Sequence, residues 1–122
     1  MIDFKTKVKI KTLKTKLFFY KLFTKPKLFL TEGTSSIFLK KLNKKEFIIG
    51  RINSDIQLNS ETISKKHALI TKKGVNFYLE DLHSTNGTFL NGEKLFPHQK
   101  YILLDEDLIL LGDVEIRFQR KL

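Results

Sequence analysis

The chain of 122 residues contains no cysteine and no tryptophan, and it has only two prolines. Without cysteine there is neither a disulfide framework nor a thiolate zinc site, and the composition fits a reducing compartment. No run of about 18 or more apolar residues occurs, so no transmembrane segment is predicted. No small-residue cleavage site follows the basic N-terminus, so we expect no signal peptide and a cytoplasmic or organellar (stromal or matrix) location.

Acidic residues are scarce in the first 27 positions. Of the 23 basic and 13 acidic side chains, this segment holds nine lysines and one acid, Asp3, which gives it a net charge of +8. The remaining residues have 14 basic and 12 acidic side chains, a net charge of +2. Hydrophobic residues make up 41% of the chain, enough for the core of one domain. The basic character therefore belongs to the N-terminal segment.

The segment 1–27 allows three interpretations. From Phe4 to Thr12 lysines alternate with apolar or threonine residues, a period of two that indicates a strand with one charged face. From Leu13 to Phe23 apolar residues become denser, and a basic amphipathic helix there would suit a membrane surface or another anionic partner. Charge runs are usually solvated, so we favour a solvated tail or an extra strand. Pro26 interrupts the pattern and marks the boundary of a basic extension over 1–27.

After the boundary, short apolar or alternating stretches repeat with turn signals between them. These predicted strands are Leu28–Leu30, Ile37–Leu39, Phe47–Ile49, Ile56–Leu58, His67–Thr71, Val75–Glu80, Tyr101–Leu104, Leu108–Leu111 and Val114–Phe118. No stretch of the body keeps a helical period over three turns. Many short strands with regular turns predict an all-β sandwich or barrel.

Two Asn-Gly pairs, at 86–87 and 91–92, mark tight turns, because both residue types tolerate a positive φ. The same stretch concentrates hydroxyl and amide side chains at Ser84, Thr85 and Asn86. Upstream, Arg51 and the Ser64-Lys65 pair add cationic and hydroxyl donors. Together these residue types suit an anionic ligand rich in oxygen.

In this order and near this spacing, the motifs resemble those of the forkhead-associated (FHA) domain. The motifs are Gly50-Arg51, Ser54-Asp55, Ser64-Lys65-Lys66-His67 and Ser84-Thr85-Asn86-Gly87-Thr88, and the resemblance extends from about Leu28 to Phe118. It implies a β-sandwich of two twisted, mostly antiparallel sheets with about eleven strands and binding loops at one end. We therefore expect an FHA domain over residues 28–119 and a C-terminal tail over 120–122.

FHA domains bind phosphothreonine, and the resemblance assigns five residues to that ligand. Arg51 would pair with the phosphate through its planar fork, Ser64 would donate its hydroxyl, and Lys65 would add a flexible charge. Thr85 would contact the phosphate from the opposite loop, and Asn86 would hold the peptide backbone through its amide. By the same resemblance the threonine methyl group packs against the loops, so phosphoserine should bind poorly.

Other motif residues are expected to support the binding loops. Gly50 would allow a close approach of the loop after its strand, His67 would hold the loops by hydrogen bonds, and Gly87 would serve a turn at positive φ. The chain departs from the family pattern where Lys65 replaces a frequent arginine. It also departs at His83 and Glu106, where the family usually has a small residue or glycine.

Several other functions are less well supported. Ser64 and His67 lack the Gly-x-Ser-x-Gly elbow and an orienting carboxylate, so we expect no enzyme. The spacing of His67, His83 and His98 fits no familiar metal site, and no cofactor motif is present. We expect a monomer that binds threonine-phosphorylated proteins. The alternatives are a phosphate-independent protein adaptor, or a nucleic-acid or membrane binder acting through residues 1–27.

Overall fold

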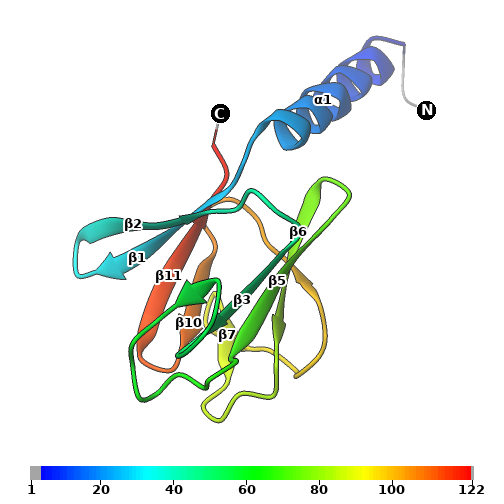
Figure 1. The fold of residues 1–122 in the computed structure, drawn as a ribbon. Helices are drawn as coiled ribbons and strands as arrows, with labels where there is room; N and C mark the ends of the chain where they lie inside the picture. The colour runs from blue at the N-terminus through cyan, green and yellow to red at the C-terminus, as the bar shows by residue number, and fades with distance from the viewer. Residues whose placement is uncertain (1–3, 122) are drawn as a thin grey trace.

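The computed structural model describes residues 4–121, with side chains from residue 12 onward, and it forms two sheets (Figure 1). The six-stranded sheet has the order β2 (Ser35–Lys41), β1 (Lys27–Glu32), β11 (Val114–Gln119), β10 (Leu108–Leu111), β7 (Thr88–Leu90) and β8 (Glu93–Lys94). The five-stranded sheet has the order β4 (Ile56–Gln57), β3 (Glu46–Gly50), β5 (Ala68–Lys73), β6 (Asn76–Asp81) and β9 (Tyr101–Ile102). The predicted sandwich of about eleven strands is confirmed.

The core lies between the sheets and is built from alternate residues of the central strands. In β6, Phe77, Leu79 and Asp81 are buried and their neighbours are half-buried. In β11 the buried residues are Ile116 and Phe118. Phe77 and Phe118 come from opposite sheets, and their ring centroids lie 6.2 Å apart. The period of two in the sequence thus sends one face of each strand into the core.

Strand register brings three loops to one end of the sandwich. Ile49 near the end of β3 lies opposite Ala68 at the start of β5, and Ala68 lies opposite Asp81 at the end of β6. Three connecting segments therefore lie at the same end of the strands of the five-stranded sheet: residues 51–55, 58–67 and 82–87. We call these three segments the loop end. In Figure 1 it lies at the bottom, far from the helix at the top.

Helix α1 (Phe4–Phe23) occupies the segment where the alternation from Phe4 to Thr12 predicted a strand, so that interpretation is wrong. A strand would need a neighbouring strand for its backbone hydrogen bonds, whereas a helix satisfies them internally. Lysine and leucine also have high helix propensity. Residues 1–3 of the predicted extension lie outside the described part. Among the described residues, no helix is both long and apolar enough to cross a bilayer.

The C-terminal end of α1 is attached to the sandwich by Arg120, which follows β11. Its Nε donates to Thr24 Oγ1 at 3.0 Å, and its Nη2 donates to the carbonyl of Lys21 in the last turn of the helix. The guanidinium also lies over the ring of Phe77, 5.5 Å from the centroid. A cation suits this carbonyl-rich end of a helix. Arg120 is therefore buried, although the sequence places it in a tail.

Replacing Arg120 with alanine should loosen α1 from the sandwich, because two hydrogen bonds to a charged group are lost. We expect the free energy of unfolding to fall by about 1.5–3 kcal/mol and amide exchange in residues 17–24 to accelerate. Urea unfolding and hydrogen exchange measure the two effects. The control is Arg117→Ala, since half-buried Arg117 meets Glu106 only at 3.5 Å. Unchanged exchange in the helix after Arg120→Ala would contradict this role.

Candidate functional site

Arg51 follows β3 at the loop end and is half-buried. Its backbone N–H donates to the carbonyl of Ser64 at 3.1 Å, which holds two of the three loops together. Its guanidinium Nε is buried without a hydrogen-bond partner among the described residues. Among the described residues, two other buried side-chain atoms lack a hydrogen-bond partner: Thr31 Oγ1 and Arg117 Nε, both on the six-stranded sheet. Buried donors are nearly always paired, so Arg51 is poised for an acceptor.

Gly50 permits the close approach on which the position of Arg51 depends. A Cβ atom at this residue would lie 2.0 Å from the carbonyl oxygen of Lys65 and 2.6 Å from Ser54 Oγ. Neither distance is compatible with van der Waals contact, and the nearer atom belongs to the backbone. Only glycine therefore allows the end of β3 to pack against the loop that carries Ser64 and Lys65.

Ser64 and Thr85 join the second and third loops. The backbone N–H of Thr85 donates to Ser64 Oγ at 3.0 Å, and the two side-chain hydroxyls lie 3.5 Å apart. The Ser64 hydroxyl is the donor in that second contact, and at 3.5 Å this hydrogen bond is long enough for a stronger acceptor to replace it. Two hydroxyl groups are thus held side by side next to Arg51.

His67 is fully buried and holds both of these loops from below. The backbone N–H of Ser64 donates to its Nδ1 at 3.1 Å, so the ring proton resides on Nε2, which donates to the carbonyl of Gly87 at 2.9 Å. With both nitrogens engaged by the backbone, the imidazole has no free position to act as a base for Ser64. In the described part of the chain no group of three potential metal ligands is found either.

Asn86 has a contact that the sequence analysis did not anticipate. Its Nδ2 donates to the carbonyl of Thr62 at 2.8 Å. Thr62 in turn is bound to Asp113, because its Oγ1 donates to the carboxylate at 2.6 Å and accepts the Asp113 N–H at 3.0 Å. The loop from Asn59 to Ile63 is therefore tied to the turn between β10 and β11.

Asp81 is a second organising residue that the sequence analysis missed. Its carboxylate accepts hydrogen bonds from Ser84 Oγ at 2.5 Å, from the Ser84 N–H at 3.2 Å and from Thr88 Oγ1 at 2.7 Å. Burial raises the pKa of Asp81, but these hydrogen bonds outweigh it and the net pKa is lowered. A serine three positions after an aspartate is the available signal, because such pairs favour local turns.

Five described residues other than glycine adopt the left-handed backbone conformation that glycine favours: Asn53, His83, Asn91, His98 and Glu106. Of these, His83, with a φ of 59°, and Glu106, with a φ of 71°, stand where the family usually has a small residue or glycine. Such a conformation costs roughly 1–2 kcal/mol for a residue with a Cβ atom. Gly87, in the same loop as His83, has a φ of 84°. The loop before Ser84 thus follows a glycine-like path although histidine occupies the turn.

Basic side chains dominate the charge of the loop end. Lys65 is exposed, and Lys66 Nζ donates to carbonyls of the first loop, including that of Ile52 at 3.2 Å. The acid in this loop, Asp55, is already paired with Lys44 at 2.5 Å. The hydrogen bond from Lys44 lowers the pKa of Asp55, which therefore remains ionised and neutralised near neutral pH. The positive charges of Arg51 and Lys65 are left for a ligand.

The structure gathers the five residues that the sequence assigns to the ligand. Arg51, Ser64 and Thr85 are joined by direct hydrogen bonds, Lys65 adjoins Ser64 in the chain, and Asn86 follows Thr85. Their contact with a phosphate stays a prediction.

Gly50→Ala should displace the loop that bears Ser64 and Lys65, because the new methyl group would overlap a backbone carbonyl. We expect a loss of stability of at least about 1–3 kcal/mol in chemical unfolding. The matched control is Gly74→Ala, where a Cβ meets nothing within 4 Å and only the φ of 64° is unfavourable. Equal stability of the two variants would show that the close approach is unimportant.

Asp81→Asn should destabilise the third loop in a pH-dependent manner. The folded-state pKa of Asp81 lies below its ordinary value of 3.8. The carboxylate therefore stabilises the fold above that pH, and its contribution is lost as the pH falls through the lower, folded-state pKa. We expect the free energy of unfolding of the wild type to exceed that of the variant by about 1–3 kcal/mol near neutral pH, and this difference should shrink in acid.

Urea unfolding at a series of pH values measures this gap, and Glu61→Gln, at an exposed loop position, is the control. A gap that stays constant from neutral pH into strong acid would contradict the assigned role of Asp81.

The middle of the chain is similar in sequence to parts of several other proteins. A family profile described as the FHA domain matches residues 47–112. The transcriptional regulatory protein EmbR of Mycobacterium tuberculosis is 38% identical over 72 residues, which cover 58% of this chain and 18% of that protein. Protein FraH of Nostoc sp. is 39% identical over 66 residues, covering 51% and 23%. The chain thus spans about a fifth of the length of these curated relatives.

Solved structures share the fold. An FHA domain studied for phosphothreonine-dependent interactions matches with a TM-score of 0.70 and 32% identity, covering 81% of this chain and 99% of that one. Mycobacterium tuberculosis EmbR in complex with a low affinity phosphopeptide matches with a TM-score of 0.68 and 31% identity, covering 78% and 24%. The family profile spans more than half of this chain and includes every residue of the candidate site. The chain belongs to the FHA domain family.

Proposed function

We propose that this FHA domain binds threonine-phosphorylated segments of partner proteins at its loop end. FHA domains are non-catalytic interaction modules, and binding here requires no chemical step. Two observations carry the proposal: the buried, unpartnered Nε of Arg51, whose backbone N–H binds the Ser64 carbonyl, and the joined hydroxyls of Ser64 and Thr85. The solved relatives that were studied with phosphothreonine-dependent interactions or a phosphopeptide support the same ligand class.

A phosphothreonine brings close to two negative charges and three acceptor oxygens to this point. Arg51 can donate directionally to two of those oxygens while keeping its charge, which lysine cannot do. The hydroxyl proton of Ser64 and the ammonium of Lys65 are the further donors nearest to it along the second loop. Charge-assisted hydrogen bonds of this kind are roughly twice as strong as neutral ones.

Asn86 has a double role in the proposal. Its Nδ2 is committed to the Thr62 carbonyl, so the amide oxygen is the atom that can accept a backbone N–H from the peptide. This arrangement couples the peptide backbone to the loop from Asn59 to Ile63. The residues that follow the phosphothreonine would then lie along that loop.

The loops are fixed before a ligand arrives. His67, Asp81 and Gly50 hold the backbone around the site through contacts that involve no ligand. Binding then orders few additional groups, which limits its entropic cost. We assign the domain to residues 28–119, with residues 1–27 as a basic extension and 120–122 as a short C-terminal segment.

A titration against a degenerate phosphothreonine peptide library tests the proposal, with unphosphorylated and phosphoserine libraries as controls. We expect saturable binding to phosphothreonine, weak binding to phosphoserine and none to threonine. Arg51→Ala should weaken binding by roughly 30-fold or more, since about 2–5 kcal/mol is lost when one partner of a buried charge pair is removed. Arg117→Ala is the control for removal of an arginine elsewhere.

Equal affinity for phosphorylated and plain peptides would instead indicate a phosphate-independent adaptor. Unchanged affinity of Arg51→Ala would place the phosphate at a different point of the surface.

A further inference from the structure

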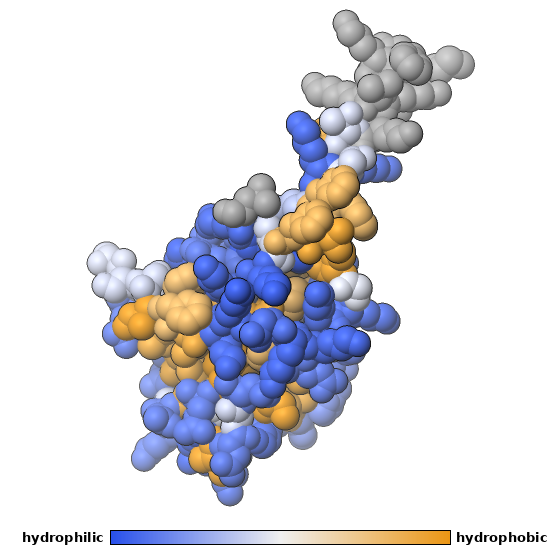
Figure 2. Space-filling model, turned by 45° about the horizontal axis from the view of Figure 1, so that its top comes forward, coloured by the Kyte–Doolittle hydropathy of each residue, from blue (hydrophilic) through white to orange (hydrophobic). Residues whose placement is uncertain are grey.

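Helix α1 exposes large apolar side chains close to where it joins the sandwich. The exposed residues are Leu13, Leu17, Phe18, Phe19, Leu22 and Phe23. Phe23 is 72% exposed, and its ring stacks on that of Phe19 at a centroid distance of 5.9 Å. Figure 2 shows apolar surface, in orange, on the part of the helix nearest the mostly hydrophilic body. Contiguous exposed apolar surface of this kind marks an interaction site.

These side chains surround the helix instead of forming one stripe. Successive residues are rotated by roughly 100°, so Phe18, Phe19, Leu22 and Phe23 lie within one broad face of the helix, whereas Leu13 and Leu17 lie on the other side. A partner protein with a groove would cover one face and leave the others in water. A lipid surface, which is fluid, can surround all of them at once.

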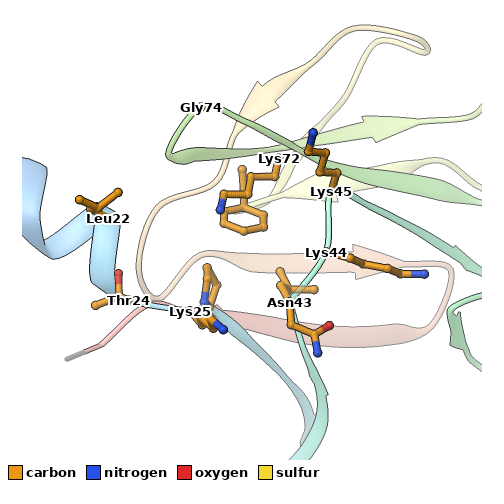
Figure 3. A pocket seen from close by; sticks show the side chains of 11 residues that line it. Leu22, Thr24, Lys25, Asn43, Lys44, Lys45, Lys72 and Gly74 are labelled. Carbon is orange, nitrogen blue, oxygen red and sulfur yellow. The ribbon is translucent and has the colours of Figure 1, made fainter.

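The charged side chains of the helix itself have one sign. From residue 4 to residue 31 the sequence has nine lysines and no acidic residue. Where α1 meets the sandwich, a hollow of about 450 Å³ is floored by Leu42 and Phe77. Lys25, Lys45 and Lys72 stand around it, as Figure 3 shows. A polyanionic surface is the complementary partner, and nine lysines per chain oppose pairing with a second copy.

The helix and the hollow form one continuous surface because their junction is fixed. Arg120 binds the last turn of α1, and Lys21 Nζ donates to Asn76 Oδ1 at 2.9 Å at the base of the β5–β6 turn. This surface lies at the end of the sandwich opposite the loop end (Figure 1).

We propose that α1 and the lysine-lined hollow dock this domain onto an anionic lipid surface. The apolar side chains at the end of α1 enter the boundary between headgroups and acyl chains, and the lysines contact lipid phosphates. Double-stranded nucleic acid would use the lysines but leave the phenylalanines without a role, because its bases are already stacked. The loop end then faces away from the lipid, free to bind a partner. This docking does not depend on the proposed phosphopeptide binding.

Flotation of the full chain with phospholipid vesicles tests the proposal. We expect binding to vesicles of phosphatidylcholine mixed with phosphatidylglycerol, weakened by salt, and none to phosphatidylcholine alone. Phe19→Ser combined with Phe23→Ser should reduce binding about tenfold or more, as should Lys25→Gln with Lys72→Gln. Phe38→Ser, which removes a phenylalanine that is 57% exposed on β2, and Lys94→Gln with Lys100→Gln, at two exposed positions, are the matched controls.

A fluorescent reporter separates insertion from adsorption by charge. The chain has no tryptophan, so Phe23→Trp introduces a single one, whose emission should shift to shorter wavelength with anionic vesicles. The proposal would be overturned if the tryptophan emission stayed at its wavelength in water although vesicles were bound. It would also be overturned if vesicle binding were unchanged in the variant with serine at positions 19 and 23. DNA binding that is insensitive to the serines, without vesicle binding, would indicate a nucleic-acid surface. Self-association lost in the serine variant, again without vesicle binding, would indicate a second copy.

Discussion

The loop end depends on one buried imidazole. His67 is the only described side chain that hydrogen-bonds the backbone of both the second and the third loop, through the Ser64 N–H and the Gly87 carbonyl. Its ring thereby fixes the second loop relative to the third. Loops without a core of their own are normally the most variable parts of a domain. Here a buried core residue restrains the loops through hydrogen bonds to their backbone.

The strands and the tight turns could be predicted from the sequence, because their signals are local. Alternation places Phe77 and Phe118 in the core, and the Asn-Gly pair at 86–87 marks a turn. Contacts across the fold have no such signal. The tie from Thr62 to Asp113 spans 51 residues, and neither residue belongs to a recognisable motif. The site residues could be predicted only through the family resemblance.

In the N-terminal segment a clear local signal predicted the wrong structure. Alternating lysines from Phe4 to Thr12 carry a clear local signal for a strand, yet the segment is helical. Periodicity reports which side chains could share a face, but a strand forms only where another strand offers its edge. What attaches the helix is Arg120, 96 residues after Thr24 in the sequence. No local pattern contains that information.

The link from Asn86 through Thr62 to Asp113 separates two properties of the site. Arg51, Ser64 and Thr85 rest on the five-stranded sheet, whereas the loop beside Asn86 is fastened to the six-stranded one. A change in the turn at Gly112, where a Cβ would lie 2.3 Å from Thr62 Oγ1, would reshape that loop without touching Arg51, Ser64 or Thr85. Under the proposed function, such a division would let a lineage acquire new partners through a remote turn while the residues assigned to the phosphate stay unchanged.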